Sequence, residues 1–251
     1  MQENLLLMQN GEIQRKIGVF MQVPKVLKKL FFLICLISFA CIPLAAEMIH
    51  SSAGLHTKPY ERSSEQTFNK PVIMLDAGHG GRDEGTKVHS FKEKKITLAT
   101  VLYTKKFLEQ MGYRVILTRS KDVEISLHRR VALANKTQSA LFVSIHYNAS
   151  KNTDAKGVEI FYYDSKDPDR AKKSRRLANY ILHYVIDQTE ANSRGVKVGN
   201  FHVIRETDMP AVLLEGGFVT NIQECSHLRR KEYLENIGKG VAQGIDKFLK
   251  S

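Results

Sequence analysis

Apolar and polar residues alternate with two different periods between positions 70 and 251 of the chain. Short apolar runs bounded by Gly, Pro or polar residues predict strands, whereas longer stretches with apolar residues three or four positions apart predict helices. The runs that predict strands are PVIMLDA (71–77), YRVILT (113–118), ALFVSIH (140–146), VEIFYY (158–163), FHVIRE (201–206) and PAVLLEGG (210–217). We therefore expect about six strands.

Four longer stretches, at 94–112, 126–137, 169–190 and 231–249, predict helices. The first ends in a glycine, and the second begins with a serine that can accept a hydrogen bond from a free backbone N–H. Strands that mostly alternate with helices are typical of parallel sheets, because a helix carries the chain back between neighbouring strands. The sequence predicts an α/β fold, a single domain with a mostly parallel central sheet of about six strands flanked by helices.

The first 46 residues follow a different pattern. Three basic residues, Lys25, Lys28 and Lys29, precede LFFLICLISFACI (30–42), and small residues follow in PLAAE. A basic segment, an apolar segment of this length and a small-residue cleavage site predict a secretory signal peptide. A membrane-spanning helix needs about 20 apolar residues, more than this run contains.

Removal of a signal peptide would leave residues 47–69, which are polar and rich in serine and predict a linker, followed by a domain over 70–251. We expect the mature protein in the periplasm or secreted to the cell envelope. Contact with a membrane is then expected only through the signal peptide or through a lipid anchor at Cys41. The pattern leaves open whether translation begins at Met1 or at Met21.

The net charge of the chain indicates which kinds of molecule it can bind. The chain has 38 Lys and Arg residues against 26 Asp and Glu residues, a net charge of +12. A basic exported protein suits anionic polymers of the envelope. We expect no nucleic-acid partner, because the basic residues are spread through the predicted helices and no nucleic-acid-binding motif accompanies them.

Three of the predicted strands end in residues that can bind a metal or move a proton: His79, His146 and Glu215. Because the carboxyl ends of parallel strands meet at one edge of a sheet, these side chains are expected to lie together. Hydrolytic zinc sites use three protein ligands and leave a position for water. Glu93, at the opening of a predicted helix, can supply the third ligand, and spacing alone leaves its role interchangeable with that of Glu215.

Asp83 and Glu84 are alternatives for the third ligand, because they also follow the first histidine. Both lie in the glycine-rich segment GHGGRDEG (78–85), where they could equally be solvated charges of a loop.

Five motifs resemble, in order, those of one family. They are LDAGHGGRDEGT (75–86), KEKKITL (92–98), SIHYNA (144–149), NSRGVKVGNFHVIRE (192–206) and MPAVLLEGGFVTN (209–221). Together they resemble the zinc-dependent N-acetylmuramoyl-L-alanine amidases, the amidase-3 family of cell-wall hydrolases. The resemblance extends from about Lys70 to the end of the chain.

The resemblance implies an α/β domain that binds one Zn²⁺ and hydrolyses the amide between N-acetylmuramic acid and L-alanine of the stem peptide of peptidoglycan. It implies that His79, Glu93 and His146 are zinc ligands and that Glu215 is the catalytic residue. It thereby separates the roles that spacing left interchangeable. The activity would serve cell-wall remodelling or daughter-cell separation, with peptidoglycan or muropeptides as substrate and with a septal or envelope activator as a possible partner.

Two residues of the matching motifs are predicted to bind substrate. Asn148 and Arg205 lie within the matching motifs and are predicted to contact substrate, although each could equally hold a loop or a sheet edge. Arg194 and Asn221 are further candidates of the same kind. Two other functions stay open: a zinc carboxypeptidase or endopeptidase acting on the stem peptide, and a wall-binding protein without catalysis.

Overall fold

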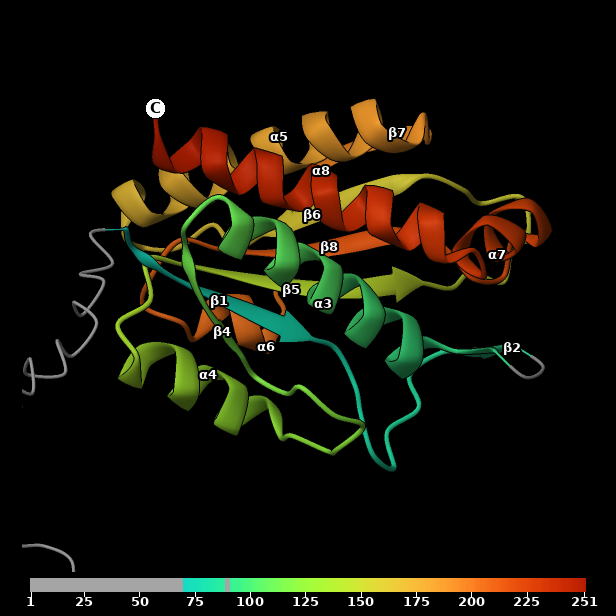
Figure 1. The fold of residues 1–251 in the computed structure, drawn as a ribbon, viewed down its shortest axis with the longest axis horizontal. Helices are drawn as coiled ribbons and strands as arrows, with labels where there is room; N and C mark the ends of the chain where they lie inside the picture. Colours follow the sequence, from blue (N-terminus) through green and yellow to red (C-terminus); the bar gives the residue numbers. More distant parts are fainter. Residues whose placement is uncertain (1–69, 89–90) are drawn as a thin grey trace, which may run out of the picture. The chain divides into compact units, whose positions relative to one another are not determined.

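The structure, a computed structural model, describes residues 70–88 and 91–251 (Figure 1). The predicted signal peptide, the linker and the possible lipid anchor at Cys41 lie outside the described residues. Among the residues that are described, no helix combines the length and the apolar character needed to span a membrane.

A six-stranded sheet forms the centre of the described chain (Figure 1). Its strands are β1 (Val72–Ala77), β4 (Arg114–Leu117), β5 (Leu141–Asn148), β6 (Val158–Tyr162), β7 (Ser193–Val198) and β8 (Ala211–Phe218). They lie in the order β4-β1-β5-β8-β6-β7, and of the five neighbouring pairs only β6 with β8 is antiparallel. The predicted α/β fold with a mostly parallel sheet of six strands is confirmed.

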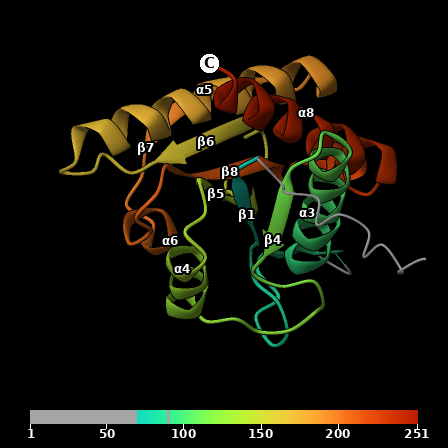
Figure 2. The ribbon, with the colours of Figure 1, turned by 60° about the vertical axis from the view of Figure 1, so that its left-hand side comes forward.

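Helices cover both faces of the sheet (Figures 1 and 2). The helices that pack on one face are α3 (Glu93–Gln110), α5 (Pro168–Thr189) and α8 (Lys231–Leu249), and those on the other are α4 (Leu127–Lys136) and the single turn α6 (His202–Arg205). A short helix, α7 (Ile222–Leu228), links β8 to α8, and a two-stranded hairpin, β2 (Lys87–Val88) with β3 (Phe91–Lys92), precedes α3. The four predicted helices are confirmed to within two residues at each end.

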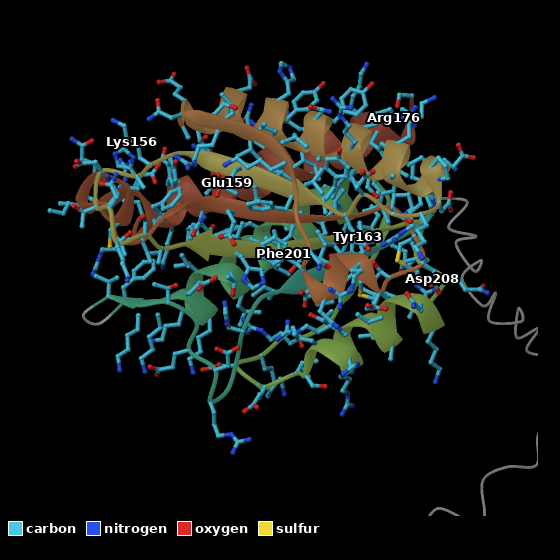
Figure 3. All side chains as sticks on the ribbon, turned by 180° about the vertical axis from the view of Figure 1, so that it is seen from behind. Lys156, Glu159, Tyr163, Arg176, Phe201 and Asp208 are labelled. Atoms are coloured by element: carbon cyan, nitrogen blue, oxygen red, sulfur yellow. The ribbon has the colours of Figure 1, made fainter. Side chains whose placement is uncertain are left out.

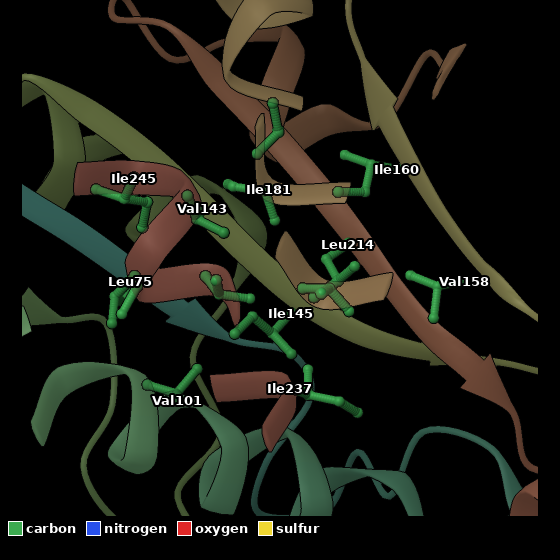
Figure 4. Packing of buried hydrophobic residues seen from close by; sticks show 14 of the residues in the cluster. Leu75, Val101, Val143, Ile145, Val158, Ile160, Ile181, Leu214, Ile237 and Ile245 are labelled. Carbon is green, nitrogen blue, oxygen red and sulfur yellow. The ribbon is translucent and has the colours of Figure 1, made fainter. Parts of the chain in front are cut away.

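The alternation of side chains along the strands decides which residues can form a site. Val143, Ile145 and Leu214 pack into the core beneath α3, α5 and α8 (Figure 4). Successive side chains of a strand point to opposite faces, so His146 and Glu215 point to the face that carries α4 and α6. That face has a smaller apolar core, which ends before the carboxyl ends of the strands. Polar side chains can therefore gather there in contact with solvent.

One predicted strand is wrong. FHVIRE (201–206) forms the helical turn α6 instead of a strand, with Phe201 as its N-cap. Val203 and Ile204 are adjacent in sequence, and both are buried in the smaller core. A helical turn can bury two adjacent side chains on one side, whereas a strand would direct one of them away from the core.

The sixth strand is instead β7, Ser193–Val198, which the pattern of apolar residues did not indicate. It lies at the edge of the sheet and pairs with β6 alone among the described strands, so all six of its residues stay partly or fully exposed. An edge strand of this kind lacks the apolar run by which the buried strands were recognised.

Candidate functional site

His79, Glu93 and His146 converge at the carboxyl edge of the sheet, from the loop after β1, the first residue of α3 and strand β5. Glu93 Oε1 lies 3.0 Å from His79 Nε2 and 3.1 Å from His146 Nδ1. The two ring nitrogens are 3.2 Å apart. Ligand atoms around a tetrahedral Zn²⁺ with bonds of about 2.0–2.1 Å are about 3.3 Å from one another, close to this spacing.

The two alternatives to Glu93 lie elsewhere. Asp83 Oδ2 is 2.9 Å from His79 Nδ1, so the carboxylate accepts the proton of that nitrogen and leaves Nε2 free to face the cluster. A carboxylate in this position is typical of metal-binding histidines, because it fixes the tautomer and the orientation of the ring. Glu84 pairs with Lys87 and Lys92 and does not join the cluster.

Glu93 is buried and is held by two backbone N–H groups. The amide of Thr86 donates to Oε2 at 2.8 Å, and the amide of Tyr147 donates to Oε1 at 3.0 Å. Burial raises the pKa of the carboxyl group, but the hydrogen bonds and charges of His146 and His79 outweigh it, and the pKa lies well below its usual range. The carboxylate is therefore charged and held in one orientation toward the two histidines.

Two glycines give the cluster its room. A Cβ atom at Gly78 would lie 2.2 Å from Cε1 of His146, far inside contact distance. Gly85 has a φ of +65°, and a Cβ atom there would lie 2.6 Å from both Glu93 Oε2 and His79 Cδ2. Glycine at these two positions thus follows from the close approach of the three side chains of the cluster to the backbone.

Glu215 occupies the strand next to His146. It is directly opposite His146 in the parallel pairing of β5 with β8, and opposite Glu159 in the antiparallel pairing of β8 with β6. Its Oε2 atom is buried and has no hydrogen-bond partner among the described residues. Burial raises the pKa of Glu215 well above its usual range, and the charges of Glu93 and Glu159 raise it further. A raised pKa is typical of carboxyl groups that take up and release a proton during a reaction.

A cavity of about 290 Å³ opens beside the two histidines. Its apolar lining includes Ile125, Leu127 and Leu213, and its acidic lining includes Asp83 and Glu124. The cluster can therefore be reached by a ligand whose apolar part enters between α4 and α6.

The two predicted substrate-binding residues are hydrogen-bonded within the protein. Asn148 donates from Nδ2 to Glu159 Oε1 at 2.8 Å and accepts at Oδ1 from the amide of Ala149 at 2.8 Å. Arg205 donates from Nε to Glu206 and from Nη1 to Asn200, both at 2.6 Å. Contact of either residue with substrate stays a prediction.

The sequence model of the family described as N-acetylmuramoyl-L-alanine amidase matches residues 73–247. The chain belongs to this amidase family. Protein YqiI of Bacillus subtilis is 35% identical over 195 residues, which cover 78% of this chain and 92% of YqiI. The N-acetylmuramoyl-L-alanine amidase CwlM of Bacillus licheniformis is 34% identical over 175 residues, which cover 69% of this chain but 66% of CwlM.

A solved structure gives the same result for the fold. The catalytic domain of the N-acetylmuramoyl-L-alanine amidase CwlV from Bacillus (Paenibacillus) polymyxa superposes with a TM-score of 0.67 at 37% identity. The match covers 72% of this chain and 98% of that domain. The six-stranded sheet with its flanking helices is thus the fold of an amidase catalytic domain.

A buried arginine that the sequence did not indicate stabilises the loop that carries His79. Arg130 of α4 pairs with buried Asp76 at 2.6 Å and donates to the carbonyl oxygens of Ala77 at 2.6 Å and His79 at 2.8 Å. His79 has a φ of +59°, a conformation that costs a residue other than glycine about 1–3 kcal/mol. The guanidinium group therefore stabilises the loop that carries His79 in a backbone conformation that costs free energy.

A second buried arginine, Arg119, supports the same loop. Arg119 donates to the carbonyl oxygens of Ala77 at 2.9 Å, Gly78 at 2.8 Å and Lys94 at 2.9 Å. It joins the loop that carries His79 to the helix that carries Glu93. A single planar group with five N–H donors can make such a set of bonds, which a lysine cannot reproduce.

We expect Arg130→Lys to weaken Zn²⁺ binding by about 10–100-fold, the usual cost of losing a group that orients a metal ligand. Competition with a chromogenic chelator measures the affinity, and thermal unfolding measures stability. Arg170→Lys is the matched control, because Arg170 also donates to backbone carbonyls, of Ile204 at 2.5 Å and Met209 at 3.1 Å, but it lies apart from the cluster. Equal losses of affinity in the two variants would contradict a specific role for Arg130.

Proposed function

We propose that this protein is a zinc-dependent N-acetylmuramoyl-L-alanine amidase. It hydrolyses the amide bond between N-acetylmuramic acid and L-alanine of the stem peptide in peptidoglycan. The observation that carries the proposal is the cluster of His79, Glu93 and His146, with Glu215 on the adjacent strand, in a chain of the amidase family.

The donor set fits zinc. Two imidazoles and one carboxylate are a common ligand set of hydrolytic zinc sites, and the three atoms already stand at nearly tetrahedral spacing. Zn²⁺ bound by these residues would act as a Lewis acid that polarises the amide carbonyl and makes water more acidic. Asp83 supports the site by holding the His79 ring with Nε2 toward the cluster.

Glu215 moves the proton in this proposal. Its unpartnered Oε2 is buried beside His146, where it can take a proton from the attacking water. The raised pKa lets the carboxyl group retain that proton and then donate it to the nitrogen of the leaving L-alanine. No serine or cysteine nucleophile is needed, because water is the attacking group.

The cellular setting is also proposed. A family of cell-wall amidases and a basic chain agree with a place in the cell envelope, outside the cytoplasm. Wall remodelling or daughter-cell separation and regulation by an envelope activator are the corresponding proposals for its role.

Mass spectrometry of digested muropeptides tests the proposal. The purified, zinc-loaded protein should release free stem peptide and a sugar that retains its lactyl group. A chelator should abolish this release, and added Zn²⁺ should restore it. Release of only a terminal D-alanine would identify a carboxypeptidase instead, and binding without cleavage would identify a wall-binding protein.

A further inference from the structure

A row of polar residues crosses the sheet at the level of the cluster. His146 of β5 is opposite Glu215 of β8, and Glu215 is opposite Glu159 of β6. Directly opposed residues point to the same face, so all three lie on the face that carries α4 and α6. Figure 3 shows this face and labels Glu159 and Phe201 on it.

Glu159 is a buried carboxylate that orients two cations. Its side chain is only 5% exposed, and Oε2 accepts hydrogen bonds from Arg194 Nε at 2.8 Å and from Lys197 Nζ. The other carboxylate oxygen, Oε1, accepts a hydrogen bond from Nδ2 of Asn148. Burial raises the pKa of Glu159, but the two cations outweigh it and lower the pKa, so the carboxylate stays charged.

Glu159 neutralises only part of the positive charge of these two residues. Two positive charges face one negative charge, and the side chains of Arg194 and Lys197 remain 35% and 40% exposed. The guanidinium group of Arg194 also lies over the ring of Phe218, with 4.9 Å from Cζ to the ring centroid. We call Arg194 and Lys197 the cationic shelf.

Acidic and basic side chains lie on opposite sides of the site. Asp83 and Glu124 line the cavity on the side of α4, whereas the shelf lies beyond Glu215 at the opposite edge of the sheet. An anionic part of a substrate is therefore attracted to the side of the shelf.

We propose that the cationic shelf binds a carboxylate of the stem peptide and so orients the substrate with its peptide across β6 and β7. The proposal rests on the proposed amidase function. Two strand spacings, roughly 10 Å, separate the row position of His146 from that of Glu159, and about three residues of extended peptide span this distance. The carboxylate therefore belongs to one of the first residues after the scissile amide.

Steady-state kinetics with two muropeptides tests the shelf. They differ only at the second stem residue, which carries either a free carboxylate or the corresponding amide. The zinc-loaded protein should show a KM about tenfold lower for the free carboxylate, as for a charge-assisted contact. Lys197→Met should remove most of this preference, mainly through KM, and Lys197→Arg should retain it. Lys106→Met, which removes an exposed charge paired with Glu235 on the other face, is the control that should keep the preference.

Calorimetry with the same two muropeptides separates this proposal from the proposed function. Correct cleavage without any preference for the free carboxylate, or a preference that survives in Lys197→Met, would overturn the shelf alone. Absence of cleavage together with tighter binding of the free carboxylate that depends on Lys197 would support the shelf and overturn the proposed function.

Discussion

Replacing Glu215 by glutamine should lower kcat by about 10²–10⁴-fold, the usual contribution of a positioned acid–base group. Glutamine has nearly the same size, but it can neither accept the proton of the attacking water nor return it to the leaving nitrogen. Because Glu215 lies outside the ligand cluster, the variant should still bind one Zn²⁺ and unfold at nearly the same temperature. Product release from muropeptides, metal content and thermal unfolding, measured on one preparation, check all three expectations.

Glu84→Gln is the matched control for this experiment. Glu84 is a carboxylate of the glycine-rich segment near the cluster, but it pairs with Lys87 and Lys92 and makes no contact with the ligands in the structure. It should keep the wild-type kcat. If Glu215→Gln instead lost its zinc along with its activity, Glu215 would be a ligand and the division of roles between it and Glu93 would be wrong.

The sequence predicted the members of the cluster because strand ends carry much of the site. His146 and Glu215 follow apolar runs that are unmistakable strands, and the parallel sheet brings their ends together. The sequence alone could not assign Glu93 and Glu215, since each is a glutamate whose carboxylate was expected at the same edge of the sheet. The structure distinguishes their surroundings: Glu93 contacts both histidines, whereas Glu215 has an oxygen without a partner.

The two buried arginines that support the site could not be predicted from the sequence, because their burial depends on contacts that form only in the folded chain. Arg119 and Arg130 are charged residues, which a pattern of apolar and polar positions assigns to the surface, yet both are 3% exposed. Their burial is stable only because Asp76 and the carbonyl oxygens of a loop distant in sequence compensate for lost water. Such compensation exists only in the folded chain, as does the edge position that gave β7 its weakly apolar sequence.

The second large effect is expected from one methyl group. Gly78→Ala places a Cβ atom 2.2 Å from Cε1 of His146 and within 2.6 Å of both ring nitrogens, so the methyl group and the ring cannot both keep their places. The His146 ring must move away from its position 3.1 Å from Glu93 Oε1. We expect Zn²⁺ affinity to fall by about 100-fold or more, at the upper end of what misplaced ligand geometry costs.

A substitution at a second glycine distinguishes an effect on metal binding from an effect on folding. Gly244 of α8 packs against α5, and a Cβ atom there would lie 2.5 Å from the Cα atom of Ile181. Gly244→Ala should therefore lower the unfolding temperature through a clash between helices while the folded fraction keeps its zinc affinity. Gly78→Ala should do the reverse, with a large loss of affinity measured by chelator competition and a smaller change in unfolding temperature. If Gly78→Ala bound Zn²⁺ as tightly as the wild type, the close approach of His146 to the backbone would not be a requirement of the metal site.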